Sequence, residues 1–262
     1  GFDHIDTAYC AKKGIQVSNV PAYGSVTVAE FAFALLLNLS RKVEKANNQL
    51  REEDSFDITA LRGFDLRGKT LGVIGTGKIG KNVVKIAKGF DMNVIAYDLY
   101  PDSAFAKENN FEYKNLTEVV SMSDVITLHT PYNKENHHLL NKKNISLMKK
   151  GVYLINTARG ALIDTEALLW GLEKGIIAGA GLDVLEDERN LKEEMKILSS
   201  GGKEILKDYK ILLEDHVLID MPNVTVTPHI AFYSKEAEEE IMKVTVNNIQ
   251  GFISSNPINL VK

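Results

Sequence analysis

The sequence predicts an α/β protein built on a doubly wound parallel sheet. From Thr70 onward, short apolar runs that end in polar residues or glycine alternate with helix-like stretches, which is the pattern of parallel βαβ units. The runs are rich in Val, Ile and Leu and do not alternate with polar residues, as expected of strands that are covered on both faces. The expected strands are Thr70–Ile74, Asn93–Tyr97, Asp124–His129, Gly151–Asn156, Ile177–Val184 and Val224–Thr227.

Helices are expected between these strands, with start and stop signals at several of them. Lys78–Phe90 and Thr165–Lys174 have helical character, and the second has Asp164 as its cap and Gly175 as its stop. Val26–Arg41 is apolar at nearly every position, so a single stripe against the core does not bury it. We expect a second subunit to cover the remainder and therefore a homodimer through this region, the alternative being a central helix packed wholly within the monomer.

Composition excludes several classes of protein. The 262 residues carry a net charge of -4, with acidic and basic residues mixed along the chain, so we expect no nucleic-acid partner and no anionic membrane surface as partner. The longest apolar stretch is shorter than the roughly 20 residues that span a bilayer. The single cysteine, Cys10, forms neither an internal disulfide nor a Cys-rich metal site and fits a reducing, cytoplasmic location.

A glycine-rich turn opens the helix that follows the first expected strand. Its residues are Gly75, Thr76, Gly77, Lys78, Ile79 and Gly80. Such glycines allow a tight turn and close approach of the backbone to a pyrophosphate at the helix N-terminus. Asp98 ends the second strand 23 positions after Gly75 (98 − 75), where an acidic residue holds the adenosine ribose hydroxyls. The residues after Asp98 offer no cation for the 2′-phosphate of NADP, so the sequence predicts a Rossmann-type site for NAD. The alternative is that Asp98 is only a turn residue with no part in binding.

Three polar side chains follow later strands, and ligands of open α/β sheets bind beyond the carboxyl ends of strands. They are Arg159, Glu188 and His229. Arg159 can grip a carboxylate with its planar fork, His229 can donate a proton to a carbonyl oxygen, and Glu188 can orient the imidazole. Taken singly, each has another explanation. Arg159 could pair with a surface acid, Glu188 could belong to a solvated acidic run, and His229 could be a core histidine. Together they predict the reduction of a 2-keto acid.

At this point the chain resembles a known family, the D-isomer-specific 2-hydroxyacid dehydrogenases, and within it the D-lactate dehydrogenases. The segments that carry the resemblance are Asn156 to Gly160, Gly181 to Val184 running to Glu188, and Thr227 to His229, preceded in the same order by Gly1 to Asp6, Asn19 to Tyr23 and Val28 to Glu30. The resemblance spans nearly the whole chain. It implies that Arg159 binds substrate, Glu188 supports the histidine and His229 is the acid/base.

The resemblance also implies a substrate class and further cofactor contacts. Ala231, Phe232 and Tyr233 after the histidine match the variant seen in D-lactate and D-2-hydroxyisocaproate dehydrogenases, and Tyr23 stands where that subgroup has a substrate-contacting tyrosine. A short aliphatic 2-keto acid such as pyruvate is therefore expected, with Tyr23, Arg159, His229 and Tyr233 around it. The remaining cofactor contacts that the resemblance implies are His129, Thr130, Pro131, Thr157, Ala158 and Asp183.

Relatives in this family have strands and helices before the segment that begins here at Gly1, so we expect an N-terminal segment to be missing. The expected domains are an NAD-binding domain at 22–231 and, at 1–21 and 232–262, the remnants of a smaller flavodoxin-like substrate domain. We expect such a chain to retain NAD but to turn over poorly.

Several further expectations and alternatives follow. The charged segment Glu186–Asp215 is interpreted as a solvated helical insertion. His4, His137, His138 and His216 are interpreted as structural or solvent-facing, and adjacent histidines at 137 and 138 point apart along any regular element, so no metal is expected. The alternatives are a D-2-hydroxyisocaproate or other D-2-hydroxyacid dehydrogenase, or an NADH-sensing protein that resembles the family's corepressors.

Overall fold

The structure, a computed structural model, contains a seven-stranded parallel sheet in the order β3-β2-β1-β4-β5-β6-β7. It describes all residues except 1, 3–4, 187, 189–190, 192–205 and 262. The strands are β1 (Thr70–Ile74), β2 (Asn93–Tyr97), β3 (Glu112–Tyr113), β4 (Val125–Leu128), β5 (Val152–Asn156), β6 (Ile177–Leu182) and β7 (Val224–Val226). The strand order reverses at β1, and the crevice at such a switch point is where dinucleotide-binding sheets take their ligand.

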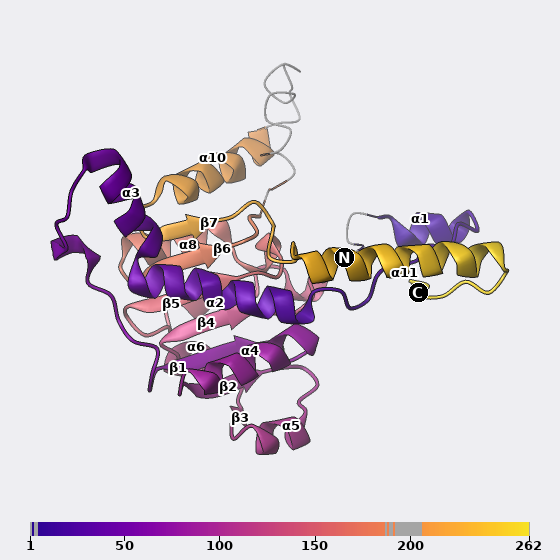
Figure 1. Cartoon of the computed structure of the whole chain (residues 1–262), viewed down its shortest axis with the longest axis horizontal. Helices are drawn as coiled ribbons and strands as arrows, with labels where there is room; N and C mark the ends of the chain where they lie inside the picture. The colour runs from indigo at the N-terminus through magenta and orange to yellow at the C-terminus, as the bar shows by residue number, and fades with distance from the viewer. Residues whose placement is uncertain (1, 3–4, 187, 189–190, 192–205, 262) are drawn as a thin grey trace.

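Helices cover both faces of the sheet, which confirms the doubly wound architecture (Figure 1). On one face α2 (Ser25–Arg41) packs against α4 (Lys78–Gly89) and against β5 and β6. On the other lie α6 (Leu116–Met122), α8 (Thr165–Glu173) and α10 (Leu206–Asp220). The remaining elements are α1 (Thr7–Lys12), α3 (Val43–Glu53), α5 (Ser103–Glu108), α7 (Lys142–Ile145), α11 (Lys235–Ile253) and the short η1 (Thr59–Leu61), η2 (Lys134–Asn136) and η3 (Gly160–Leu162).

Two apolar clusters, one on each face, form the core. Ile126, Leu128 and Leu154 belong to the cluster under α8, and Leu71, Val73 and Ile155 belong to the cluster under α2 and α4. Neighbouring residues of one strand thus enter opposite clusters, which is why these strands carry unbroken apolar runs instead of alternating ones.

The central helix α2 is covered largely within the chain, and the expectation that a second subunit covers the remainder stays a prediction. Val28, Ala29, Ala32, Phe33, Leu35 and Leu36 are all buried against the sheet and α4. The face away from the sheet carries Val26, Glu30 and Ala34, which are exposed. The helix is apolar on most sides because it packs on the sheet and on a neighbouring helix at once.

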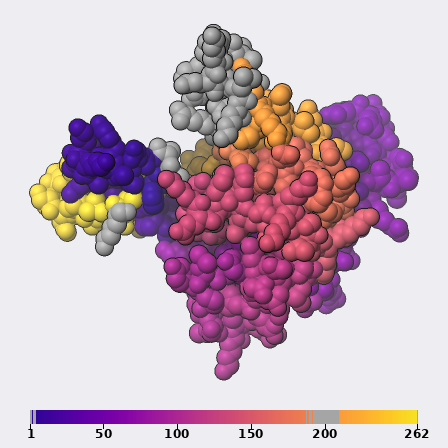
Figure 2. Space-filling model, turned by 180° about the vertical axis from the view of Figure 1, so that it is seen from behind, coloured from indigo at the N-terminus to yellow at the C-terminus, as the bar shows by residue number. Residues whose placement is uncertain are grey.

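The two ends of the chain meet beside the sheet. Residue Ser18 forms an antiparallel bridge with Leu260, Val261 donates its backbone N–H to Val17 at 2.8 Å, and the Ser18 hydroxyl donates to the carbonyl of Ile258. Figures 1 and 2 show α1, α11 and the C-terminal residues gathered in one lobe next to the main body. Within the described residues, no helix has the length and apolar character needed to cross a membrane.

Candidate active site

The glycine-rich turn after β1 has the backbone shape that its glycines permit. Gly75 has φ +92°, and a Cβ there would lie 2.7 Å from the backbone N of Thr130. At Gly80 a Cβ would lie 2.0 Å from the carbonyl oxygen of Gly75, so α4 packs tightly on the turn. Around Gly77 a Cβ would meet nothing within 4 Å, and no side chain caps the helix that Gly77 begins. The N-terminal N–H groups of α4 are therefore placed to receive an anion such as a pyrophosphate.

Asp98, at the end of β2, is bonded to the same turn. Its Oδ2 accepts from the backbone N–H of Thr76 at 2.6 Å and from the Thr76 hydroxyl at 2.9 Å, and its Oδ1 accepts from the N–H of Tyr100. Because the Thr76 hydroxyl donates to Asp98, the Tyr113 hydroxyl at 2.8 Å is the donor to Thr76. Asp98 is thus fixed beside the glycine turn, and its contact with a ribose stays a prediction.

Two buried polar atoms at the ends of β4 and β5 support the fit of a dinucleotide. Neither His129 Nδ1 nor Thr157 Oγ1 has a hydrogen-bond partner among the described residues, and buried polar groups are seldom left so. The other ring nitrogen of His129, Nε2, lies 2.8 Å from the Thr127 hydroxyl. Burial lowers the pKa of His129 to about 3, so the ring is neutral at physiological pH.

Arg159 is positioned by an asparagine that the sequence reasoning quoted but did not count as a site residue. Asn156, the last residue of β5, donates to the carbonyl of Arg159 at 2.9 Å and accepts from the N–H of Ala158. The following Gly160 is needed because a Cβ would lie 1.9 Å from the carbonyl oxygen of Leu185. This close approach brings the Arg159 loop against the turn that leads into Glu188.

His229 and Glu188 form the pair that the sequence predicts. The His229 Nδ1 lies 2.9 Å from Glu188 Oε2, and Glu188 Oε1 accepts from the backbone N–H of Leu185 at 3.3 Å. Both side chains are partly exposed, so a substrate can reach the ring. His229 itself has φ +58°, a left-handed backbone that is uncommon outside glycine and clusters at functional sites.

Asp183 holds the loop that carries His229. It is fully buried, its Oδ1 accepts from the Thr227 hydroxyl at 2.5 Å and from the N–H of Ile230, and its Oδ2 accepts from the N–H of Ala231. Asp183 is also expected to contact the cofactor, and that contact stays a prediction. Its role in positioning the loop was missed, since its partners lie more than 40 residues away in sequence.

Aromatic rings line the approach to His229. Phe232 lies edge-on to His229, with 6.3 Å between ring centroids, and edge-on to Tyr23 at 6.0 Å. Tyr233 contacts Phe232 at 6.1 Å and is 63% exposed. Of the two predicted substrate tyrosines, Tyr23 therefore reaches the histidine through Phe232, and Phe232 itself was left out of the predicted site.

The expectation about the two adjacent histidines is wrong. His137 and His138 do not point apart: their rings stack with centroids 3.8 Å apart, because His138 has φ +52° and the pair lies outside any regular element. The charged segment Glu186–Asp215 lies partly outside the described residues. Its described part is helical from Leu206, as expected, and it contains both the exposed Lys210 and the fully buried Asp215.

Comparison with known proteins gives a consistent result. A family model described as the NAD binding domain of D-isomer specific 2-hydroxyacid dehydrogenases matches residues 33–231. The aromatic 2-oxoacid reductase of Clostridium sporogenes is 43% identical over 253 residues, which are 96% of this chain and 73% of that protein. The D-lactate dehydrogenase of Escherichia coli K12 is 40% identical over 251 residues, 95% of this chain and 72% of that protein.

Solved structures agree. The crystal structure of D-lactate dehydrogenase from Aquifex aeolicus, complexed with NAD and lactic acid, superposes with a TM-score of 0.87 at 38% identity. The superposition covers 100% of this chain and 78% of that chain.

Proposed function

This chain belongs to the D-isomer-specific 2-hydroxyacid dehydrogenase family, and from that membership we propose that it reduces a short aliphatic 2-keto acid, pyruvate before others, to the D-2-hydroxy acid. It is an NAD-dependent oxidoreductase. The observation that carries the proposal is the 2.9 Å contact between His229 Nδ1 and Glu188 Oε2 at the end of the sheet that also holds the glycine turn.

Each catalytic side chain has one task in this proposal. The hydride for the carbonyl carbon of the keto acid would come from NADH when it is bound. Arg159 binds the substrate carboxylate and polarises the carbonyl with its guanidinium. His229 gives a proton to the carbonyl oxygen as it becomes a hydroxyl, and takes it back in the reverse reaction. Glu188 accepts the Nδ1 proton of His229, which fixes the tautomer and leaves Nε2 to face the substrate.

The cofactor would lie along the switch point of the sheet. The turn from Gly75 to Gly80, with Thr76, Gly77, Lys78 and Ile79 between, would hold the pyrophosphate, and Asp98 would hold the adenosine ribose. The contacts that complete this proposed site are His129, Thr130, Pro131, Thr157, Ala158 and Asp183.

The aromatic rings beside His229 support a small substrate. Phe232 lies edge-on to both Tyr23 and His229, and a ring so near the histidine would leave room for a small substituent on the keto acid, such as the methyl group of pyruvate. A second candidate is an aromatic 2-keto acid, because a relative with 43% identity bears the name aromatic 2-oxoacid reductase. In that case the three rings would stack against the substrate ring instead of excluding it.

The chain is proposed to have two domains and to form a dimer. Residues 22–231 form the NAD-binding domain, and 1–21 and 232–262 belong to the substrate domain, as the lobe in Figure 2 supports. We propose a homodimer in the cytoplasm, with an interface through the 26–41 region that includes its exposed residues Val26, Glu30 and Ala34. The exposed apolar side chains of Val43, Leu50, Phe56 and Ile58 continue that surface and support it.

The test is a substrate screen with the purified protein. NADH oxidation is measured with pyruvate, 4-methyl-2-oxopentanoate and phenylpyruvate, and the product is analysed for its stereochemistry. We expect D-lactate from pyruvate at the highest kcat/KM, and loss of turnover in His229→Gln but not in His216→Gln, which changes a histidine on α10. Faster turnover of phenylpyruvate would transfer the assignment to the second candidate. Tight NADH binding without oxidation by any keto acid would refute the enzyme and favour an NADH sensor.

A further inference from the structure

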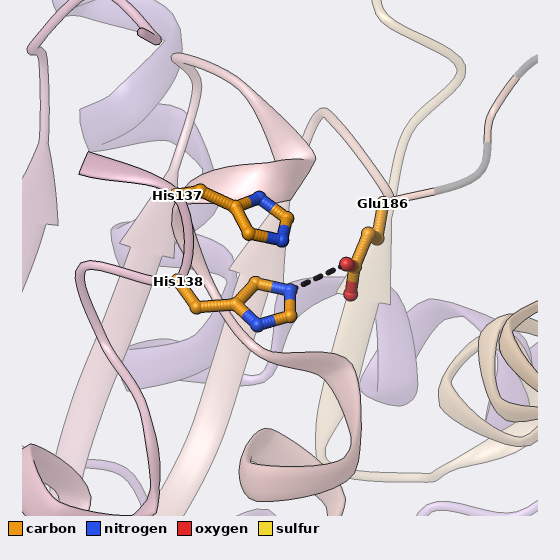
Figure 3. A group of neighbouring side chains, drawn as sticks. All are labelled: His137, His138 and Glu186. Carbon is orange, nitrogen blue, oxygen red and sulfur yellow. Dashed lines mark hydrogen bonds and ion pairs between the residues drawn. The ribbon is translucent and has the colours of Figure 1, made fainter. Parts of the chain in front are cut away.

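A second group of chemically active side chains lies outside the catalytic pair. His137 and His138 follow η2, and Glu186 follows β6, so two loops meet at the same edge of the sheet (Figure 3). One nitrogen of each histidine and one carboxylate oxygen of Glu186 all lie within 4.8 Å of one another. The His138 Nε2 and Glu186 Oε1 are 2.6 Å apart. Two imidazoles and a carboxylate are a donor set typical of zinc and its first-row neighbours.

The second polar atom of each side chain is already approached by another group. Glu186 Oε2 accepts from the backbone N–H and the hydroxyl of Thr165, at 3.2 and 2.7 Å. His138 Nδ1 lies 3.9 Å from Asp164 Oδ2, and His137 Nδ1 lies 3.4 Å from the Tyr132 hydroxyl. Metal ligands are usually oriented in this way by outer partners. The atoms that remain for a common ligand are the two Nε2 nitrogens and Glu186 Oε1.

The distances require only a small adjustment. A tetrahedral ion with bonds of about 2.1 Å holds its donors about 3.4 Å apart, between the 2.6 Å and 4.8 Å that these atoms span. His138 and Glu186 are partly buried and braced, whereas His137 is exposed. An ion between them would move His138 Nε2 and Glu186 Oε1 apart from 2.6 Å to about 3.4 Å, and the exposed His137 ring would turn toward the ion. The exposure of His137 also gives an ion a path from solvent.

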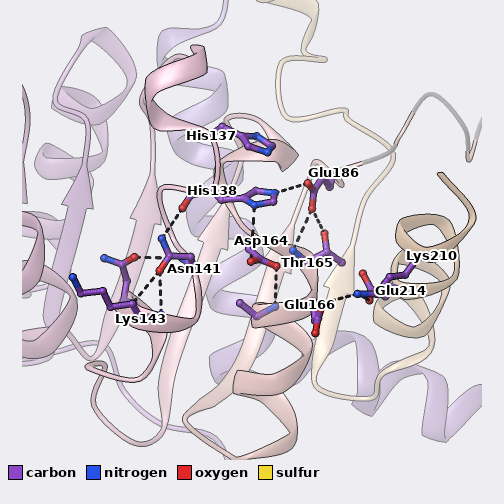
Figure 4. Close-up of polar contacts among 12 residues, drawn as sticks. His137, His138, Asn141, Lys143, Asp164, Thr165, Glu166, Glu186, Lys210 and Glu214 are labelled. Carbon is purple, nitrogen blue, oxygen red and sulfur yellow. Dashed lines mark hydrogen bonds and ion pairs between the residues drawn. The ribbon is translucent and has the colours of Figure 1, made fainter. Parts of the chain in front are cut away.

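The surroundings favour a cation. Carboxylates of Asp164, Glu166, Glu186 and Glu214 gather at this edge (Figure 4). Lys210 pairs with Glu166 and Glu214, at 2.5 and 3.5 Å, whereas Asp164 and Glu186 both lie beside His138, at 3.9 and 2.6 Å from its ring nitrogens. An ion of charge +2 would therefore enter a region where negative charge is in excess.

We propose that His137, His138 and Glu186 bind a divalent transition-metal ion of the zinc class, with water as the fourth ligand. The ion takes the place of the hydrogen bond between His138 Nε2 and Glu186 Oε1. Hard cations such as Ca²⁺ and Mg²⁺, which prefer oxygen ligands alone, are not expected to bind here. The site is separate from the catalytic pair, although Glu186 stands two residues before Glu188 in the chain.

The experiment measures metal binding by the metal-free protein, with no substrate or cofactor added. Titration calorimetry with Zn²⁺ is expected to show one site per chain, and Co²⁺ is expected to give the intense visible absorption of tetrahedral coordination. His137→Ala removes an exposed ligand without disturbing the core, and Glu186→Gln keeps the shape of the third ligand. Each is expected to weaken Zn²⁺ binding at least tenfold, while His216→Ala, on α10, leaves it unchanged.

Three results would overturn the proposal. The first is no saturable Zn²⁺ binding to the wild-type protein. The second is binding that survives both His137→Ala and Glu186→Gln at full strength. The third is binding that disappears in His229→Gln, which would place the ion at the catalytic pair. Thermal unfolding of each variant without metal verifies that the variants are folded, so a loss of binding reports on the ligands.

Discussion

The buried His129 predicts a specific dependence of stability on pH. Its side chain is only 8% exposed, and burial lowers its pKa from 6.5 to about 3. The folded protein therefore keeps this ring neutral down to low pH, while the unfolded chain protonates it near pH 6.5. Below pH 6.5 the unfolded state therefore binds one proton more than the folded state. The contribution of His129 to the free energy of unfolding is complete above pH 6.5 and is lost progressively as the pH falls from 6.5 toward 3.

The size of the loss follows from these values. At pH 5.0 the solution lies 1.5 units below the ordinary value of 6.5, and each unit is worth about 1.36 kcal/mol. The free energy of unfolding should thus fall by about 2 kcal/mol between pH 7.5 and pH 5.0 through this residue alone. His129→Gln, which can keep a hydrogen bond to Thr127 but cannot titrate, should lack this part of the loss.

Urea unfolding measures it. Trp170 is the single tryptophan and its fluorescence reports unfolding in wild type, in His129→Gln and in His137→Gln at both pH values. We expect the wild type to lose about 2 kcal/mol more than His129→Gln, and His137→Gln, at an exposed ring, to follow the wild type. Parallel losses in all three proteins would show that burial does not keep His129 neutral.

Three further changes test the proposed site, and a fourth, Gly80→Ala, serves as a contrast to Gly77→Ala. Glu188→Gln removes the carboxylate 2.9 Å from His229 Nδ1 and should lower kcat about 100-fold in steady-state assays, with NADH affinity unchanged. Arg159→Lys loses the planar fork and should raise KM for the keto acid about 10- to 100-fold, the worth of one charged hydrogen bond. Gly77→Ala should fold normally, since its Cβ meets nothing within 4 Å, yet weaken NADH binding about tenfold or more in fluorescence titrations; Gly80→Ala should instead lower the free energy of unfolding by about 1–3 kcal/mol.

For each of the three changes at the proposed site, one result would contradict the role assigned to that residue. Wild-type kcat in Glu188→Gln would mean that the carboxylate does not support the histidine. An unchanged KM in Arg159→Lys would remove the arginine from the substrate. Wild-type NADH affinity in Gly77→Ala would place the pyrophosphate away from the start of α4.

Local signals predicted the sheet well. The bounds of β1 and β2 agree with the structure, and Asp164 caps α8 by accepting from the N–H of Ala167, as expected. The edge strand β3 was missed, because its two residues are too few to form an apolar run. The sequence also extended β6 through Val184, whereas Asp183 leaves the strand to bond the loop after β7.

The site was predictable as far as residue type and strand ends determine it. Arg159, Glu188 and His229 were predicted because each follows a strand, and parallel strands end at one edge of a sheet; the structure brings Glu188 and His229 together. The stacking of His137 on His138 was not predictable, because it depends on one left-handed residue in a loop. For the same reason Phe232 was missed: its position between Tyr23 and His229 depends on how the loop after β7 folds back.

Two carboxylates position His229, one through its main chain and the other through its ring. Asp183 is fully buried and binds backbone and hydroxyl donors on both sides of the histidine, so it fixes the main chain that keeps φ at +58°. Glu188 is partly exposed and binds the ring, so it fixes the imidazole. The first task needs a rigid, water-free anchor to compensate backbone strain, and the second needs a group at the solvent edge where substrate enters. This separation explains why the chain keeps an acidic residue immediately after β6 and another five positions later.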